Sequence, residues 1–332
     1  MKITHLLGDE AFNKLQDEWD TLAGQSITDT PFQTHAYQRA WWQHLQPAGA
    51  TLHTLAARRD DGQLAAIGCF YLLDGGLYFN GCVEETDYLD LIVRVEEAEA
   101  GWTAVLRHLL HPDFPAWQIA QLCNVPAASP TRGILAGLAG ENGLEYHEEV
   151  SEVCPIIPLP ATFAAYLEML DSKQRREISR KLRRADAAEA FLRQIGPEDD
   201  LPQAVADFLT LLQLSTFEKR DWLNNGRRAV FHETAQAALA ASTLQLLFIE
   251  IEGRKAAALF NFDYKGRVWV YNSGLDPAAF GALSPGVVLT AKAVELAIEN
   301  GRSEFDFLRG SESYKYQFGA QDSEIYRITL KK

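Results

Sequence analysis

Ionisable side chains crowd around a short apolar segment at residues 304–308. Asp306 lies within the segment, and four more follow it: Arg309, Glu312, Tyr314 and Lys315. Because ligands bind at the carboxyl ends of strands in α/β sheets, this pattern predicts a site of proton transfer. Partial burial would raise the pKa of the Asp306 carboxyl towards neutrality, which suits a base. A structural pairing of Asp306 with Arg309 or Lys315 fits equally well, and Glu312 and Glu218 are further candidate bases.

A second feature is the run Ser284-Pro285-Gly286-Val287, which precedes an apolar stretch of helical period. Serine can cap a helix, proline loses no needed N–H at the first position, and glycine lets a ligand approach the backbone. The free N–H groups and positive dipole of a helix start suit a pyrophosphate. A plain capped helix needs the same residues, so both interpretations stay open.

A third feature is a basic stretch in a chain of formal charge −14. Its members are Lys173, Arg175, Arg176, Arg180, Lys181, Arg183 and Arg184. Arg176 and Arg180 are spaced to share one helix face, which would suit a nucleotide or another phosphorylated partner. A solvated helix face is the alternative, since Ile178 and Leu182 already give this helix an apolar side.

These features together resemble the CelD-like acetyltransferases, a bacterial branch of the GNAT acyltransferase superfamily related to the Fem-type aminoacyl transferases. The matching residues are Pro285, Gly286, Asp306, Phe307, Leu308, Arg309, Gly310, Glu312, Tyr314 and Lys315. The basic stretch and the phrases PFQTHAYQRAWW and DYLDLIV also look like that family. The resemblance implies an α/β fold of tandem GNAT-like mixed sheets flanked by helices. It also implies acetyl-CoA or another acyl-CoA as co-substrate.

The resemblance assigns roles to several residues. Main-chain groups near Val270 and Tyr271 would polarise the acyl carbonyl, and either Tyr314 or Tyr316 would protonate the departing sulfur. Other donor contacts would come from Ser284, Gly286, Val287, Arg309 and Lys315. The loop departs from the usual GNAT pattern, because Val287 and Val288 follow Gly286.

In Fem-type relatives a groove between two domains takes a nucleotide-linked precursor. By resemblance, acceptor contacts here would be Tyr37, Trp41, Trp42, Tyr88, Asp90, Arg176 and Arg180. Adjacent tryptophans in an amphipathic helix are more often core residues, and we expect that of Trp41 or Trp42.

Hydrophobic period and turn signals predict the same order of elements twice. In the first half, helices near 9–24 and 35–46 precede three strands with turns at Asp61-Gly62 and Gly75-Gly76. A strand at 87–93, a helix near 96–110, a strand at 117–125, a helix from Ser129 and an extended stretch at 144–159 follow. In the second half, helices near 161–190, 202–217 and 229–241 precede strands at 244–251, 256–264 and 267–274, which are joined by turns at Glu252-Gly253 and Lys265-Gly266. A helix from Pro285, a strand at 304–308, a short helix and a strand at 324–330 follow. We expect two domains, a degenerate copy at 1–155 and the acyltransferase domain at 156–332, whose last strand could return to the first.

Composition narrows the class of protein. The acidic charge argues against general nucleic-acid or anionic-membrane binding, and no apolar run is long enough to cross a bilayer, so cytoplasm is the default. Four well-separated cysteines without a CxxC pair indicate reduced, mostly buried thiols. His108 and His111 have no partner at metal-ligand spacing, so we expect no metal.

The sequence therefore predicts an N-acyltransferase that uses acyl-CoA and acts on a small-molecule or sugar-linked amine, with cell-envelope or exopolysaccharide metabolism as a candidate setting. Transfer should be direct, because no Ser/His or Cys/His nucleophile pattern is present. Two alternatives stay open: a Fem-type transferase that uses aminoacyl-tRNA, and an inactive binding protein of a polysaccharide system.

Overall fold

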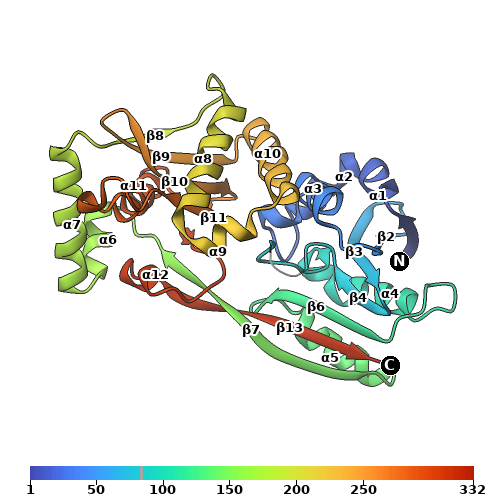
Figure 1. Ribbon diagram of the computed structural model, residues 1–332. Helices are drawn as coiled ribbons and strands as arrows, with labels where there is room; N and C mark the ends of the chain where they lie inside the picture. Colours follow the sequence, from blue (N-terminus) through green and yellow to red (C-terminus); the bar gives the residue numbers. More distant parts are fainter. Residues whose placement is uncertain (83–84) are drawn as a thin grey trace. The chain divides into compact units, whose positions relative to one another are not determined.

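The computed structural model describes residues 1–82 and 85–332. Contacts divide the chain into two compact units (Figure 1). Unit 1 combines Met1–Val153 with Ser323–Lys332, and unit 2 is the continuous stretch Cys154–Asp322. The fold class is α/β, with mixed sheets flanked by helices, as the sequence predicts.

The sheet of unit 1 has the order β1-β2-β3-β4-β6-β13-β7. Its strands are β1 (Lys2–Leu7), β2 (Thr51–Arg58), β3 (Leu64–Leu73), β4 (Gly76–Phe79), β6 (Ile119–Pro126), the first part of β7 (Glu145–Pro158) and most of β13 (Gln321–Lys331), with β5 (Ile92–Val93) beside β3. β4 and β6 run parallel, and β13 lies antiparallel to β6.

Helices and 3-10 turns accompany this sheet. They are α1 (Glu10–Lys14), α2 (Gln16–Ala23), η1 (Pro31–Gln33), α3 (His35–Leu45), η2 (Val95–Glu97), α4 (Ala98–Leu109) and α5 (Thr131–Glu141). Large aromatic side chains fill the core, among them Trp19, Phe70 and Trp102, each almost wholly buried. Their burial is the main source of stability for this unit.

The sheet of unit 2 has the order β7-β12-β11-β10-β9-β8. Beside the last part of β7, its strands are β8 (Phe191–Gln194), β9 (Leu244–Ile251), β10 (Arg254–Tyr264), β11 (Arg267–Leu275) and β12 (Glu304–Asp306). β9, β10 and β11 are joined by two tight turns in which both central residues have positive φ, at Glu252-Gly253 and Lys265-Gly266. That is the geometry of favoured hairpin turns, which confirms the two predicted turns.

Helices cover both faces of the unit 2 sheet. They are α6 (Phe163–Met169), α7 (Ser172–Ala187), α8 (Leu201–Ser215), α9 (Phe217–Trp222), α10 (Asn225–Ala240), η3 (Gly281–Leu283), α11 (Pro285–Glu299) and α12 (Ser313–Gln317). α6, α7 and α11 pack on the face that carries Ala257 and Leu259. On the other face, Phe208 of α8 and Phe231 of α10 pack against Phe260.

The two units repeat one plan. Each has a meander of three antiparallel strands, a helix, and a further strand parallel to the last of the three: β2-β3-β4 with β6, and β9-β10-β11 with β12. Each is completed by one more antiparallel strand. For β12 that strand is β7, and for β6 it is β13, so each unit takes its closing strand from the segment that follows the other unit's parallel strand.

Several element predictions were wrong in detail. The helix expected over 161–190 is interrupted, because Asp171 caps a new helix by accepting the N–H groups of Lys173 and Gln174. β1, β8 and α9 were not predicted, and the strand expected at 87–93 is reduced to the two residues of β5. Such short or edge elements carry little periodic signal in the sequence.

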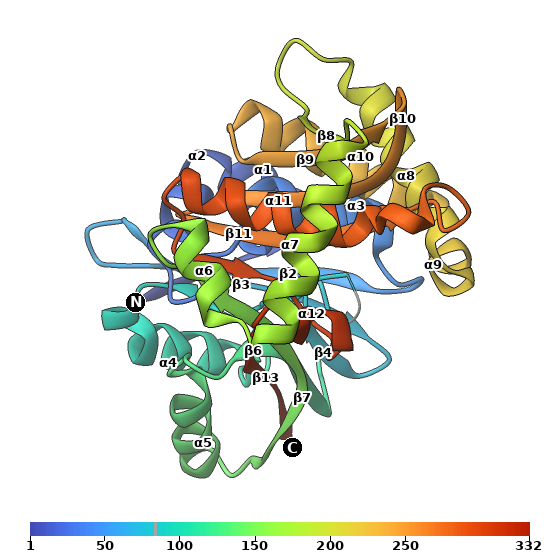
Figure 2. The same cartoon turned by 90° about the vertical axis from the view of Figure 1, so that its left-hand side faces the viewer.

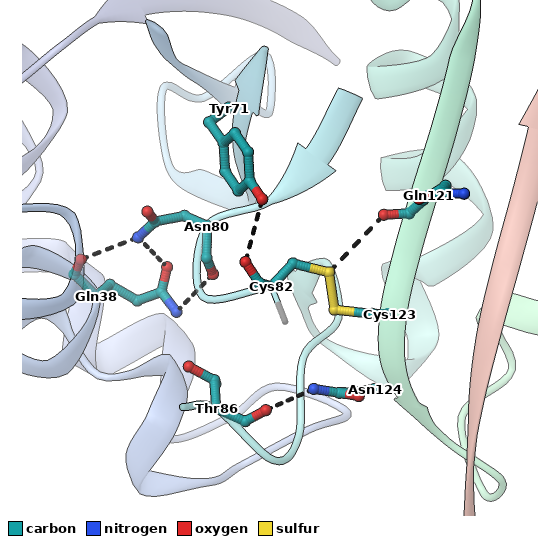
Figure 3. The surroundings of a disulfide bond; sticks show 8 residues. All are labelled: Gln38, Tyr71, Asn80, Cys82, Thr86, Gln121, Cys123 and Asn124. Atoms are coloured by element: carbon teal, nitrogen blue, oxygen red, sulfur yellow. Dashed lines mark hydrogen bonds between the residues drawn. A yellow bond between two sulfur atoms is a disulfide. The ribbon is translucent and has the colours of Figure 1, made fainter. Parts of the chain in front are cut away.

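The expectation of four reduced cysteines is also wrong. Cys82 and Cys123 form a disulfide (Figure 3), whereas Cys69 and Cys154 are free and buried. Parallel pairing of β4 and β6 brings the chain segments of Cys82 and Cys123 together across 41 residues of sequence. Spacing along the chain could not reveal that proximity.

Candidate active site

β11 and β12 separate immediately after a short parallel pairing. The pairing ends where Trp269 lies opposite Asp306; β12 stops there, whereas β11 continues to Leu275. A register shift between β10 and β11 leaves Tyr271 as an extra residue on β11, a β-bulge. Beyond Trp269, one edge of β11 is therefore not covered by β12, and its main-chain groups can meet other partners.

A cavity of about 390 Å³ lies along this part of β11. Five residues predicted for the site line it: Val270 of β11, Ser284, Gly286 and Val287 at the start of α11, and Tyr314 of α12. Most other lining side chains are apolar. Three separate segments, all in unit 2, thus bring predicted donor-site residues to one concave site of the size that ligands occupy.

The start of α11 differs from the expected capped helix. Ser284 adopts a left-handed conformation, and its side chain makes no capping hydrogen bond. Its main-chain oxygen instead accepts the N–H groups of Val287 and Val288. Among the described residues no partner is found for the N–H of Gly286, which therefore remains available beside the cavity to an anion.

Tyr314 is the candidate proton donor that lines the cavity. Its ring stands edge-on to that of Phe307, 5.9 Å between centroids. The residue keeps 40% of its surface exposed, yet loss of water around the hydroxyl, and then the Glu312 carboxylate, raise the pKa of the phenol. The phenol therefore stays protonated through the neutral range. Tyr316 does not line the cavity, and its hydroxyl donates to Asp322.

Asp306 is buried but does not line the cavity. Side chains alternate along a strand, and here Phe305 and Phe307 face the cavity while Asp306 does not. One carboxylate oxygen accepts the N–H of Leu308 at 2.7 Å, and Leu308 has a positive φ. Asp306 thus supports the strained turn that leads to α12 through its bond to a main-chain N–H. Arg309 is half-buried in the same turn.

Lys315 holds the turn rather than facing a ligand. Its side chain is almost completely buried, and its ammonium donates to the main-chain oxygens of Leu308, Arg309 and Gly310 at 3.1, 2.7 and 2.9 Å. The Glu312 carboxylate lies 2.9 Å away. An ammonium has three N–H donors, so these contacts leave none for a phosphate. The donor contact expected of Lys315 finds no support in this geometry.

Lys219 is a residue of this region that the sequence did not reveal. It comes from α9, and its ammonium donates to the main-chain oxygen of Ser273 on β11 at 2.6 Å. Burial lowers the pKa of Lys219 to about 8; Glu312 opposes this shift and Lys315 adds to it. Ser273 lines the cavity, so a titratable amine touches its wall. No motif marks Lys219, because its position depends on packing of α8 and α9 against β11.

The basic stretch forms α7, which lies across α11 and also contacts η3 (Figure 2). Ile178 is buried on the packed side, while Arg176 and Arg180 are exposed. Arg180 makes two hydrogen bonds to Glu177, of 3.0 and 2.7 Å, within the helix. A solvated face is therefore present, and it lies near the turn that precedes α11.

The predicted acceptor residues of the first half all lie in unit 1 and are buried: Tyr37, Trp41, Tyr88 and Asp90. The hydroxyl of Tyr37 donates to the main-chain oxygen of Glu85. Trp41 stacks on Tyr71. In the structure as it stands these side chains form part of the interior of unit 1.

Asp90 is the centre of a buried polar network. Its carboxylate accepts hydrogen bonds from Ser129, Thr131 and Thr28, and from the N–H of Leu91. Burial raises the pKa of Asp90 to about 6, although each of these bonds opposes the shift. The carboxylate ties segments distant in sequence together, which accounts for its burial.

β4 and β6 of unit 1 correspond to β11 and β12 of unit 2, but in unit 1 the chain beyond the paired residues is linked covalently. β4 and β6 also pair over three residues and then diverge, but the Cys82–Cys123 disulfide connects them just past that point (Figure 3). Nearby, Asn80 donates to the side-chain and main-chain oxygens of Gln38, and Tyr71 donates to the Cys82 oxygen. The counterpart of the unit 2 opening is thus bridged.

The comparisons with known proteins agree with this geometry. Residues 172–316 match the model of a family described as an acetyltransferase (GNAT) domain. The match covers less than half of the chain and lies within unit 2. The matched stretch runs from the start of α7 into α12 and includes the residues at the opening of β11 and β12.

Solved structures extend the likeness to the whole chain. FemX aligns with a TM-score of 0.69 at 11% identity, over 98% of this chain and 97% of that one. A conserved protein of unknown function from Bacteroides thetaiotaomicron aligns with a TM-score of 0.61 at 12% identity, over 99% of this chain and 100% of that one. L-PGS from Bacillus licheniformis aligns with a TM-score of 0.55 at 10% identity, over 83% of each chain. At such identities the likeness establishes the fold alone; the comparison with curated proteins found no match.

Two further observations bear on cofactors and membranes. Within residues 1–82 and 85–332, no group of three or more histidine, cysteine, aspartate or glutamate side chains is arranged to hold a metal ion. In the same residues, no helix combines the length and apolar character needed to cross a bilayer.

Proposed function

We propose that unit 2 transfers an acyl group from acyl-CoA to an amine. The observation that carries this proposal is a single cavity that contains both the available N–H of Gly286 and the protonated phenol of Tyr314. The Gly286 N–H suits the pyrophosphate of the donor, and the Tyr314 phenol suits its departing sulfur. The GNAT match over this region supports acyltransfer.

The reaction assigns a task to each group. The acceptor nitrogen bonds to the thioester carbonyl carbon, the carbon–sulfur bond breaks, the amine loses one proton, and the departing thiolate gains one. Tyr314 gives its hydroxyl proton to the sulfur and is reprotonated from water. Main-chain N–H groups of the bulge at Val270 and Tyr271 are aimed, in this proposal, at the carbonyl oxygen as charge develops on it.

Glu312 is the proposed proton acceptor for the amine. It caps α12, its side chain is 59% exposed, and the charge of Lys315 lies 2.9 Å away. Its carboxylate also influences the pKa of both Tyr314 and Lys219, so it lies close to both. Asp306 has a positioning role in this scheme, since it holds the turn that delivers Glu312 and Tyr314.

Phosphates of the donor would extend from Gly286 towards α7. Arg176 and Arg180 are exposed on that helix, which contacts the turn before α11. We propose that unit 2, rather than unit 1, takes the donor, because the disulfide bridges the corresponding strands in unit 1. Unit 1 would then be the degenerate copy, with Tyr37, Trp41, Tyr88 and Asp90 in its interior.

The signature at 304–321 favours, by resemblance, the CelD-like branch and a sugar-linked or small-molecule amine in cell-envelope metabolism. The rival donor is aminoacyl-tRNA. What favours the rival is that α11 offers the single N–H of Gly286 where a glycine-rich loop would offer several.

Calorimetry with CoA tests the donor directly. We expect wild-type protein to bind CoA, and Gly286→Val to weaken binding about tenfold or more, since a side chain there enters the anion site and meets Leu275. Gly137→Val on exposed α5 is the matched control, because nothing lies within 4 Å of a Cβ at that position. Tight, salt-sensitive tRNA binding without CoA binding would establish the rival instead. If neither bound, the inactive binding protein would be favoured.

A further inference from the structure

Apolar side chains form much of the wall of the donor cavity. Many of its lining side chains are apolar and at most 7% exposed, among them Ala257, Leu259, Val270, Leu289, Phe305 and Phe318. They come from β10, β11, α11, β12 and the end of α12, and all belong to the hydrophobic core of unit 2. We call these six residues the cavity floor.

The cavity is open to solvent, so water lies against this apolar floor when no ligand is bound. Displacing that water with an apolar group is favourable, because apolar surface is then removed from water. Ala257 has the smallest side chain of the six, so it leaves room over the floor. The space is therefore matched to an apolar occupant.

The polar parts of a CoA thioester do not suit this floor. Amides and phosphates need hydrogen-bond partners when they are buried. Besides the apolar side chains, polar groups line the cavity: Ser284 and the Gly286 N–H at the helix start, Ser273 on β11, Asp276 just after β11, and Tyr314 on α12. The Asp276 carboxylate accepts the N–H of Ala278. Thr290 also lines it, but its hydroxyl already donates to the Gly286 oxygen within α11. An acetyl group is too small to cover the six side chains of the floor.

We propose that the donor carries an acyl chain longer than acetyl, and that this alkyl chain lies on the cavity floor. The inference rests on the proposed function, and it specifies the substrate class of the same site. The polar groups around the cavity hold the rest of the thioester, while the floor selects for chain length. Each buried CH₂ should strengthen binding about fourfold.

The experiment compares CoA, acetyl-CoA, butyryl-CoA, hexanoyl-CoA and octanoyl-CoA by calorimetry and, with an amine acceptor, by kcat/KM. For wild-type protein we expect affinity and kcat/KM to rise from acetyl to hexanoyl by about tenfold or more. Ala257→Val fills part of the floor and should remove the rise while leaving the affinity for CoA itself unchanged. Ala282→Val is the matched control, since Ala282 is exposed on η3 and does not line the cavity.

Each outcome separates the two proposals. A rise with chain length that Ala257→Val removes supports the inference. Equal or better use of acetyl-CoA overturns it and leaves the proposed function standing. If CoA and every thioester fail to bind, the proposed function falls, and the inference falls with it. The wild-type series decides the matter even if Ala257→Val does not fold.

Discussion

The Lys219 ammonium of α9 donates a hydrogen bond to the Ser273 oxygen of β11, 2.6 Å away. Close by, the Ser215 hydroxyl at the end of α8 accepts the N–H of Leu275. Two side chains from α8 and α9 thus occupy main-chain groups on the edge of β11 that β12 leaves uncovered. The strand is held open without a neighbouring strand at that edge.

The pKa of Lys219, lowered to about 8, leads to a prediction of how the stability of the protein depends on pH. The unfolded value is near 10.5, so between pH 8 and 10.5 the unfolded chain binds more protons at this residue, and stability gains with rising pH. Relative to Lys219→Met, wild-type protein should therefore gain stability across that window and lose the gain as pH falls through 8. Denaturant titrations of both proteins between pH 8 and 10.5 would measure the difference. A difference independent of pH would contradict the lowered pKa.

Tyr314→Phe should reduce kcat about a hundredfold or more while leaving donor affinity nearly unchanged, because only the proton transfer to sulfur is lost. Steady-state kinetics and calorimetry with acyl-CoA would separate the two effects. Tyr316→Phe is the matched control, since it removes the same atom from a hydroxyl that bonds Asp322 away from the cavity. Equal losses in both variants would remove Tyr314 from the mechanism.

Gly274→Ala should destabilise the protein by about 1–3 kcal/mol or more. A Cβ at this position would come within 2.4 Å of the Leu212 main-chain nitrogen and 2.6 Å of the Leu211 carbonyl carbon, so α8 would have to move away from β11. Gly281→Ala meets nothing within 4 Å and should change stability by less than about 0.5 kcal/mol. Urea denaturation measures the stability of both variants. Similar midpoints would contradict the close approach of α8 to β11 at Gly274.

Lys315→Met should cost about 2–4 kcal/mol and lower activity as well. It leaves three main-chain oxygens without their donor and releases the turn that carries Tyr314. Lys331→Met, at an exposed ion pair with Glu145, is the control and should have little effect. If Lys315→Met were as stable as wild type but bound acyl-CoA poorly, the original interpretation of Lys315 as a donor contact would be restored.

The disulfide predicts two titratable thiols, not four, in unfolded protein prepared without reductant. Peptide mapping should find Cys82 and Cys123 in one cross-linked pair. Cys82→Ser and Cys123→Ser should each cost roughly 2–4 kcal/mol, and the double variant no more than either, because both remove the same link. Four thiols would show that the pair is reduced.

The sequence contains local signals, and these predict well. Glycine between two strand-like runs predicts the turns at Glu252-Gly253 and Lys265-Gly266, and Pro285 marks the start of α11 to the residue. The association of Val270, Gly286 and Tyr314 in one cavity follows from the resemblance. The role of a residue cannot be predicted from the sequence when it depends on the direction in which its side chain points. Ser284 does not cap, and Lys315 turns inward, because the surrounding main chain decides both.

Contacts between distant segments are the part that sequence reasoning misses. Lys219 meets Ser273 across 54 residues, and Cys82 meets Cys123 across 41. Neither pair has a spacing rule, and each depends on how strands and helices pack. Asp306 illustrates the intermediate case, since its place in an apolar strand predicted burial correctly but could not show that its neighbours, Phe305 and Phe307, would face the cavity instead.

The return of β13 to β6 has a consequence for synthesis of the chain. Residues Ile325–Lys331 pair with β6, so the segments of unit 1 that leave the ribosome first lack one of their strands until residues 325–331 have been made. Unit 2, by contrast, receives β7 before the rest of its own sheet is made. A nascent chain would thus carry an unpaired β6 edge until then, and a chain that stops before residue 325 would keep that edge permanently exposed to aggregation.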